Sequence, residues 1–145
     1  MSADFKQLMK FSEQLEKLNS EQKDQFLESC CKELAARLLA KVIKRTDGFK
    51  HSTGTLRRGW TAGQDQNAVT YANSLRVNHF GNVYQIEIIN PVEYASYIEY
   101  GHRTRDHQGW VDGKFMLTIS EQEINNSTEA ILAKKLNKFM KDVFT

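Results

Sequence analysis

Apolar side chains recur at steps of three and four residues through the first third of the chain, which is the spacing of one helix face. One such stripe covers residues 4–18 and a second covers residues 20–45. Asn19 and Ser20 interrupt the pattern and supply an N-cap for the second helix. The sequence therefore predicts two successive amphipathic N-terminal helices. The second stripe consists of Phe26, Leu27, Cys30, Leu34, Leu38 and Val42.

The apolar pattern changes to alternation in the middle of the chain, which is typical of half-buried strands. Residues 75–80 and 83–90 form two such runs, and Gly81 and Asn82 separate them. A Gly-Asn pair favours a two-residue hairpin turn, because such turns need a positive φ. We therefore expect the two runs to pair as antiparallel strands in a small sheet. Residues 68–72 are a weaker strand candidate.

A short aromatic helix is predicted directly after this sheet. Three tyrosines fall at helical spacing after Pro91, which ends the preceding strand because proline has no N–H for the ladder. Gly101 ends the helix, since glycine accepts the left-handed conformation that helix ends often need. Residues 102–112 are predicted to form an irregular polar loop. We expect the aromatic rings here to fill a small core. The predicted structural hub consists of Trp60, Tyr94, Tyr97, Tyr100, Gly101 and Trp110.

Helical spacing returns after this loop and continues to the C-terminus. The segment is either one bent helix or two short ones, because Asn125, Asn126 and Ser127 have weak helix propensity. The fold class is therefore α+β: two N-terminal helices, a small antiparallel sheet, a short aromatic helix and a long C-terminal helix. At 145 residues the chain is most simply one domain. Its predicted parts are a helical region 4–45, a loop and sheet 49–90, a short helix and loop 92–112, and a C-terminal helix 113–143.

The composition is typical of a soluble globular protein, with 40% hydrophobic and 26% charged residues. No apolar run approaches the roughly 18 residues of a membrane span, so we expect no membrane contact. The only two cysteines, Cys30 and Cys31, are adjacent. Neighbours on a helix point about 100° apart and cannot easily form a disulfide. We therefore expect reduced thiols in a cytoplasmic setting, with one of the two packed in the core.

The net charge is only +2, which gives no global electrostatic argument for nucleic-acid binding. Residues 37–58 nevertheless hold seven basic residues against one acid, Asp47. These charges either dock phosphate or an acidic partner, or complement helix ends and stay solvated. The second interpretation is the simpler one. The basic residues are Arg37, Lys41, Lys44, Arg45, Lys50, Arg57 and Arg58.

No catalytic, cofactor-binding or metal-binding constellation emerges from the sequence. One polar loop carries four possible metal ligands, but their spacing matches no zinc pattern. Glu93 and Glu99 flank the aromatic helix, yet six residues on a helix place them on opposite sides, which argues against shared acid–base work. We therefore expect no cofactor and no enzymatic activity. The four possible metal ligands are His102, Asp106, His107 and Asp112.

Three blocks occur in a fixed order along the chain, at residues 53–60, 92–101 and 109–117. They read Thr-Gly-Thr-Leu-Arg-Arg-Gly-Trp, Val-Glu-Tyr-Ala-Ser-Tyr-Ile-Glu-Tyr-Gly and Gly-Trp-Val-Asp-Gly-Lys-Phe-Met-Leu. In this order, between helical ends, the chain resembles the tail-component family of long-tailed bacteriophages. These are small head–tail joining, neck or tail-completion proteins that also occur in prophages. The middle block is the most specific of the three. The chain departs from the family where Asp112 replaces a frequent proline.

The resemblance implies a non-enzymatic virion protein of the head–tail junction, made in the host cytoplasm. It implies assembly as a homo-oligomeric ring with other phage connector or tail proteins, with a monomer when isolated and contact to DNA in the lumen. A ring needs a heterologous interface, which an open sheet edge can supply. The candidate partner surface consists of Arg57, Arg58, Glu93, Glu99, His102, Arg103, Arg105, Asp106 and His107.

Two rival functions come from other classes. The first is a small nucleic-acid-binding module that uses the basic stretch at residues 37–58, which would bind with a marked salt dependence. The second is a metal-dependent enzyme built on residues 102–112, which would gain thermal stability from metal. We rank the virion protein first, the nucleic-acid module second and the metalloenzyme last.

Overall fold

The computed structural model describes residues 15–47, 54–64, 66–81 and 83–144. It confirms the α+β class, with two long helices and two separate two-stranded antiparallel sheets. The predicted helix at residues 4–18 lies almost entirely outside the described residues. The elements in order are α2 (Ser20–Asp47), α3 (Thr55–Gly59), α4 (Ala68–Ser74), β1 (Asn78–Phe80), β2 (Val83–Gln85), α5 (Ala95–Tyr100), β3 (Gly101–Arg103), β4 (Trp110–Asp112) and α6 (Met116–Phe144).

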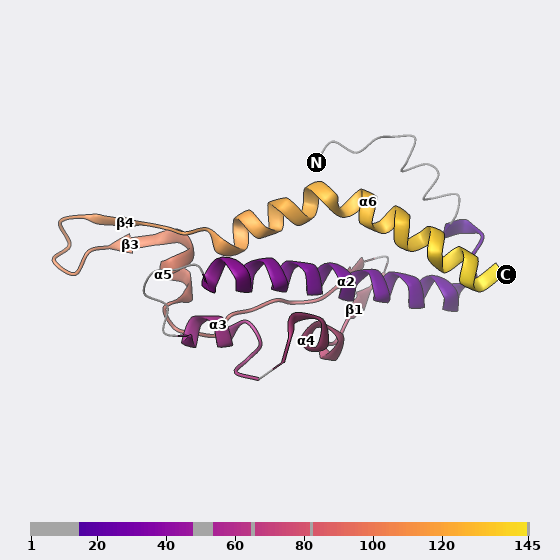
Figure 1. Ribbon diagram of the computed structural model, residues 1–145, viewed down its shortest axis with the longest axis horizontal. Coiled ribbons are helices and arrows are strands. Elements are labelled where there is room, and N and C mark those ends of the chain that lie inside the picture. The colour runs from indigo at the N-terminus through magenta and orange to yellow at the C-terminus, as the bar shows by residue number, and fades with distance from the viewer. Residues whose placement is uncertain (1–14, 48–53, 65, 82, 145) are drawn as a thin grey trace.

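The long helices α2 and α6 lie side by side and form the body of the molecule (Figure 1). α2 begins where the sequence predicts, because Asn19 caps it. The Asn19 Oδ1 accepts from the Gln22 N–H at 2.8 Å, and the Gln22 side chain accepts from the Asn19 N–H at 3.1 Å. Toward this end of α2, Phe26 packs on Phe139 of α6 with ring centroids 5.3 Å apart. This contact fastens the start of α2 to the end of α6.

The main core lies near the other end of α2, where α3 and α4 cover it. Trp60 follows α3 and is only 3% exposed. Its indole Nε1 donates to the Thr46 hydroxyl of α2 at 3.0 Å, and Thr46 is itself fully buried. Trp60 therefore ties the segment that follows α3 to the core, and this member of the predicted structural hub is a packing residue. The buried members of this core are Ala35, Ala36, Leu39, Val42, Leu56, Trp60, Ala72 and Met116.

The C-terminal segment is one continuous helix that changes direction near its middle (Figure 1). Hydroxyl groups return hydrogen bonds to the backbone along it. The Ser127 hydroxyl lies 3.1 Å from the Glu123 carbonyl oxygen, and the Thr128 hydroxyl lies 2.7 Å from the Ile124 carbonyl oxygen. Such bonds compete with the helix ladder and bend helices. Of the two alternatives for this segment, one bent helix is confirmed.

Both short helices beside α2 differ from the sequence prediction. The strand candidate at residues 68–72 is wrong, because these residues form α4. Asn67 caps that helix by accepting from the Thr70 N–H at 2.8 Å, and Ala72 is buried against α2. The cap and the packing outweigh the strand preference of the valine and threonine. α3 was not predicted at all.

The predicted hairpin is present, but its strands are shorter than expected. β1 and β2 pair antiparallel with Phe80 opposite Val83, which confirms the turn that the Gly-Asn pair indicates. The ladder ends at Gln85 rather than at Pro91, so the residues between them have no strand partner within the described chain. The Tyr84 hydroxyl donates to Asp24 of α2, which fixes this hairpin to the body.

The two cysteines behave as the sequence predicts. Both are free thiols, with Cys30 buried and Cys31 half-buried. Burial raises the pKa of the Cys30 thiol to about 12. Thiol reactivity depends on the thiolate, so Cys30 is a packing residue in this fold.

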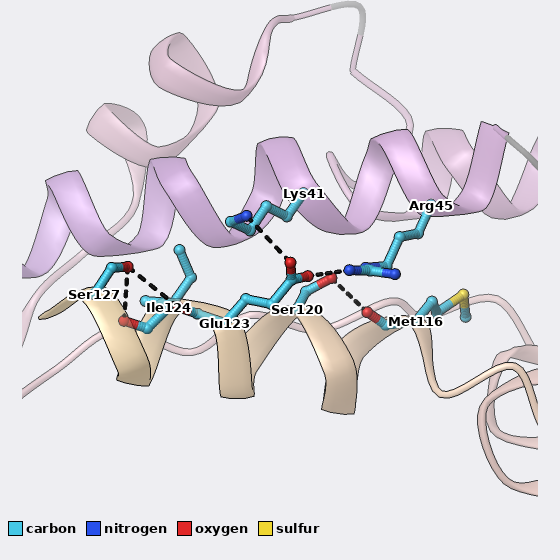
Figure 2. Close-up of polar contacts among 7 residues, drawn as sticks. All are labelled: Lys41, Arg45, Met116, Ser120, Glu123, Ile124 and Ser127. Atoms are coloured by element: carbon cyan, nitrogen blue, oxygen red, sulfur yellow. Dashed lines mark hydrogen bonds and ion pairs between the residues drawn. The ribbon is translucent and has the colours of Figure 1, made fainter. Parts of the chain in front are cut away.

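An ion-pair cluster joins α2 to α6 (Figure 2). Lys41 and Arg45 of α2 both point to Glu123 of α6, with the Lys41 Nζ 3.6 Å from the Glu123 Oε2. The hydrogen bond from Arg45 lowers the pKa of Glu123, and the charge of Lys41 acts in the same direction. The cluster therefore favours the ionised carboxylate in the folded state.

Because the pKa of Glu123 lies below its ordinary 4.5 in the folded chain, its contribution to stability is complete above that pH. It is lost as the pH falls through the lowered pKa. We expect the melting temperature of the wild type to fall more steeply than that of Glu123→Gln between about pH 6 and pH 3. Thermal unfolding at pH steps measures this. Glu121→Gln, at an exposed neighbour, serves as the control. Parallel pH profiles for wild type and Glu123→Gln would contradict the prediction.

Candidate assembly surface

The aromatic helix α5, the hairpin β3–β4 and the start of α6 meet at one end of the body (Figure 1). Two glycines allow this close crossing. Gly101 has φ +92, and a Cβ on it would lie 2.6 Å from the Val111 carbonyl oxygen. A Cβ on Gly113 would lie 2.3 Å from the Glu99 carbonyl oxygen. Any larger residue at either position forces the backbones apart. The prediction that Gly101 ends α5 is confirmed.

Glu99 of α5 caps the first turn of α6. Its side chain is buried, at 5% exposure, and accepts from the backbone N–H groups of Leu117 and Thr118 at 2.9 Å each. The Thr118 hydroxyl also donates to it, at 2.7 Å. A carboxylate at this position satisfies unpaired N–H groups and complements the helix dipole. Assignment of Glu99 to a partner surface is therefore wrong, because its carboxylate is used inside the chain.

A sequence signal for this cap does exist. α6 begins at Met116, and the preceding Gly113-Lys-Phe segment contains no serine, threonine, aspartate or asparagine that could act as a local N-cap. A long helix without a local cap needs acceptors from elsewhere in the chain. Backbone bonds complete the junction, since Lys114 N–H donates to the Ile98 carbonyl at 2.8 Å and Phe115 N–H to the Glu99 carbonyl at 3.1 Å.

Residues 101–112, hereafter the arm, form a second hairpin that projects beyond the helices (Figure 1). The prediction of an irregular loop here is wrong, since Arg103 pairs with Trp110 across the two strands. The tip is held by its own hydrogen bonds. The Thr104 hydroxyl donates to the Asp106 Oδ1 at 2.6 Å, and the Gln108 N–H donates to the same oxygen at 3.0 Å. The bond from Thr104 is the main cause of a lowered pKa for Asp106.

The predicted aromatic hub is only partly a packing centre. Trp60 is buried, but Tyr94, Tyr97, Tyr100 and Trp110 are between 39% and 63% exposed. The expectation that these four rings fill a core is wrong, because Ile98 and Glu99 provide the inward side of α5.

The exposed rings gather around the base of the arm. Tyr97 lies 6.1 Å from the His102 ring, and Tyr100 meets Phe115 edge-on at 6.4 Å. We refer to Tyr97, Tyr100, Trp110 and Phe115 as the aromatic end. A cluster of exposed apolar side chains of this kind is typical of an interaction site.

Most of the other predicted surface residues are exposed at this end of the molecule. Arg103, Arg105, Asp106 and His107 are exposed on the arm, and His102 is half-buried at its base. The buried His102 Nδ1 has no hydrogen-bond partner among the described residues. Glu93 precedes α5 and is exposed, while Arg57 and Arg58 are exposed on α3, which lies below α5 in the view of Figure 1.

The basic stretch is largely compensated by acids. Arg57 pairs with Asp47 at 2.9 Å, and Lys41 and Arg45 both pair with Glu123. Arg37 lies 4.0 Å from Glu33 on the same helix. A phosphate-binding surface needs cations that are free to neutralise phosphates. This arrangement gives no support to the nucleic-acid module.

The metalloenzyme interpretation also finds no support in the geometry. Across residues 15–47, 54–64, 66–81 and 83–144, no three histidine, cysteine or acidic side chains come together in a way that could hold a metal ion. Asp106 instead closes the turn at the tip of the arm. None of the helices in these same residues is long and apolar enough to cross a membrane.

Comparison with protein families matches residues 9–101 to the HK97-gp10-like family, described as a candidate tail component of bacteriophages. The match covers well over half of the chain and includes the first two of the three sequence blocks. The chain belongs to this family of bacteriophage tail components. Searches of curated proteins and of solved structures give no match. The family is structural, which places the chain among virion proteins that contact other tail proteins.

Proposed function

We propose that this chain is a structural, non-enzymatic protein of the phage head–tail junction that acts as a single domain by assembling into a ring. The observation that carries the proposal is the arm, which projects from the body and exposes Trp110 at 59%. Membership of a tail-component family supports the same conclusion. The partners are further copies of the chain and other connector or tail proteins.

The physics of ring formation supports this proposal. A closed ring requires that one surface of each subunit meets a different surface of the next. The arm and the aromatic end lie at one end of the molecule, whereas the β1–β2 hairpin, on which Phe80 is 67% exposed, lies away from them on the body (Figure 1). Exposed rings at the base of a projecting hairpin lose water contact when a neighbour covers them, which favours association. The molecule therefore has distinct surfaces for distinct neighbours.

The location follows from this role. The chain is made in the cytoplasm of the bacterial host and ends in the virion, at the junction of head and tail. When dilute it is a monomer, because the aromatic end alone is a small surface. Arg58 and the arginines of the arm are exposed and can face DNA in the lumen of the ring.

Size-exclusion chromatography with light scattering, followed by electron microscopy of concentrated protein, tests the proposal. We expect a concentration-dependent ring that Trp110→Ser weakens. The matched control is Phe144→Ser, which removes an equally exposed aromatic ring from the far end of α6. A chain that stays monomeric at every concentration and binds no tail protein would refute the proposed function.

A further inference from the structure

The five residues after β2, at positions 86–90, have the side-chain alternation of a strand but no strand partner. Ile86 and Ile88 pack against the main core, while Glu87 and Ile89 face outward, with Ile89 55% exposed. Within the described chain, no hydrogen bond joins the backbone of Glu87, Ile88 or Ile89 to any other group. In an extended segment the N–H and C=O groups of alternate residues point the same way, so those of Glu87 and Ile89 together form an open edge at the surface.

Contacts at both ends hold residues 86–90 in an extended conformation. At its start, Gln85 pairs with Asn78 in the β1–β2 ladder. At its end, the Asn90 side chain donates to the Leu56 carbonyl at 2.7 Å and accepts from the Val92 N–H at 3.0 Å. A segment that is already extended loses little conformational entropy when a further strand pairs with it. It is therefore a preformed acceptor for strand addition.

The arm of the same chain supplies a strand that can add to this edge. Thr104 N–H donates to the Gly109 carbonyl at 3.0 Å, so this pair is hydrogen-bonded across the hairpin. Hydrogen-bonded and non-hydrogen-bonded pairs alternate along an antiparallel ladder. The neighbouring pair, Arg103 and Trp110, is therefore non-hydrogen-bonded, and the N–H and C=O groups of both residues point away from the hairpin. Each strand of the arm thus has an open edge that can pair with another chain.

The side chains of the two edges are complementary. The open edge at residues 86–90 presents an acid, Glu87, close to the apolar Ile89. The arm presents Arg103 on β3, with the exposed Trp110 opposite it on β4. Neither Glu87 nor Arg103 has an ion-pair partner in the described parts of the chain. Opposite charges and apolar side chains on neighbouring strands stabilise such a pairing.

We propose that the β3 edge of the arm of one copy adds as a strand to residues 86–90 of the next copy, with Arg103 close to Glu87. A second copy is the occupant because donor and acceptor belong to one chain and the arm projects away from the body that carries the acceptor (Figure 1). The contact joins two different surfaces, as a ring requires. The inference rests on the proposed ring assembly and names the surfaces that make it.

Charge reversal in trans tests the contact by sedimentation velocity. Glu87→Arg and Arg103→Glu each place like charges across the interface, so each variant alone should self-associate about tenfold more weakly than the wild type. An equimolar mixture of the two variants should associate like the wild type. In that mixture, the carboxylate introduced on the arm of one variant meets the guanidinium introduced on the acceptor of the other, and the native pair forms at the remaining contacts. Asp142→Arg and Lys138→Glu make the same charge changes on exposed positions of α6 and should have no effect.

Hydrogen exchange of the wild type gives a second readout that needs no variant. The amides of Glu87 and Ile89 should exchange fast in dilute protein and become protected on association. Single variants that associate like the wild type, or a mixture as weak as its components, would overturn this inference and leave ring assembly intact. Unprotected amides in the associated wild type would do the same. A wild type that never self-associates would overturn both proposals.

Discussion

Trp60→Ala is expected to lower the free energy of unfolding by about 3–5 kcal/mol. The side chain is 3% exposed and lies where α2, α3 and α6 meet. Its removal leaves a cavity that the surrounding helices cannot fill, and it also strips the Thr46 hydroxyl of a donor at 3.0 Å. Denaturant unfolding followed by circular dichroism measures the change.

The hydrogen bond can be separated from the packing. Thr46→Val keeps the volume but leaves a buried indole N–H without an acceptor, which costs about 1–3 kcal/mol. The same change made in a Trp60→Phe background should cost less, because no N–H remains to be satisfied. Equal costs in both backgrounds would show that the bond contributes nothing.

Tyr97→Ala provides the contrast within the same set of aromatic residues. This ring is 59% exposed, so we expect a change within about 0.5 kcal/mol. A loss as large as that of Trp60→Ala would mean that Tyr97 packs in the core, as the sequence alone indicates. The pair of variants thus tests the division between buried and exposed aromatic residues.

Periodicity over long segments predicted much of this fold. The stripe at residues 20–45 and the terminal stripe correspond to α2 and α6, because a long amphipathic face specifies one helix type and one buried side. The turn at Gly81 was predicted from local backbone chemistry alone. In each case the signal is local and repeated, so tertiary contacts do not change it.

Short elements were harder to predict, because contacts with the rest of the chain decide their secondary structure. Residues 68–72 contain β-branched side chains that favour a strand, yet the Asn67 cap and the surface of α2 make them helical. The arm was missed because its strands have only three residues each and its tip is polar. Three tyrosines at helical spacing indicated a buried face, but Ile98 and Glu99 occupy that face instead.

The location of the candidate site was predicted from the sequence, but the contacts of its individual residues were not. Arg103, Arg105 and His107 are exposed on the arm as expected of a partner surface, and their role there stays a prediction. Glu99 was expected on the same surface but is buried within the chain, although charged residues are rarely buried. The lack of a local N-cap before Met116 is visible in the sequence, but the identity of the residue that replaces it is not, because Glu99 reaches α6 only through the tertiary crossing of α5 and α6.

Glu99→Ala is expected to lower the free energy of unfolding by about 2–4 kcal/mol. The variant removes the acceptor of three hydrogen bonds at 2.7–2.9 Å and leaves two partly buried N–H groups of α6 unpaired. The free energy of unfolding of Glu99→Gln should lie between those of Glu99→Ala and the wild type. The amide oxygen of the glutamine still accepts a hydrogen bond, while its NH₂ group faces another donor. Chemical denaturation gives these values.

Glu93→Ala is the matched control, since Glu93 is an exposed glutamate six residues earlier and should shift stability by less than about 0.5 kcal/mol. Hydrogen exchange adds a local readout, because loss of the cap should speed exchange at Leu117 and Thr118 before the rest of α6. Since the same junction fixes the base of the arm through Lys114 and Phe115, Glu99→Ala should also loosen the arm. If Glu99→Ala has the stability and the hydrogen exchange of the wild type, the prediction is wrong. In that case α6 begins without help from α5, and the glycines alone position the arm.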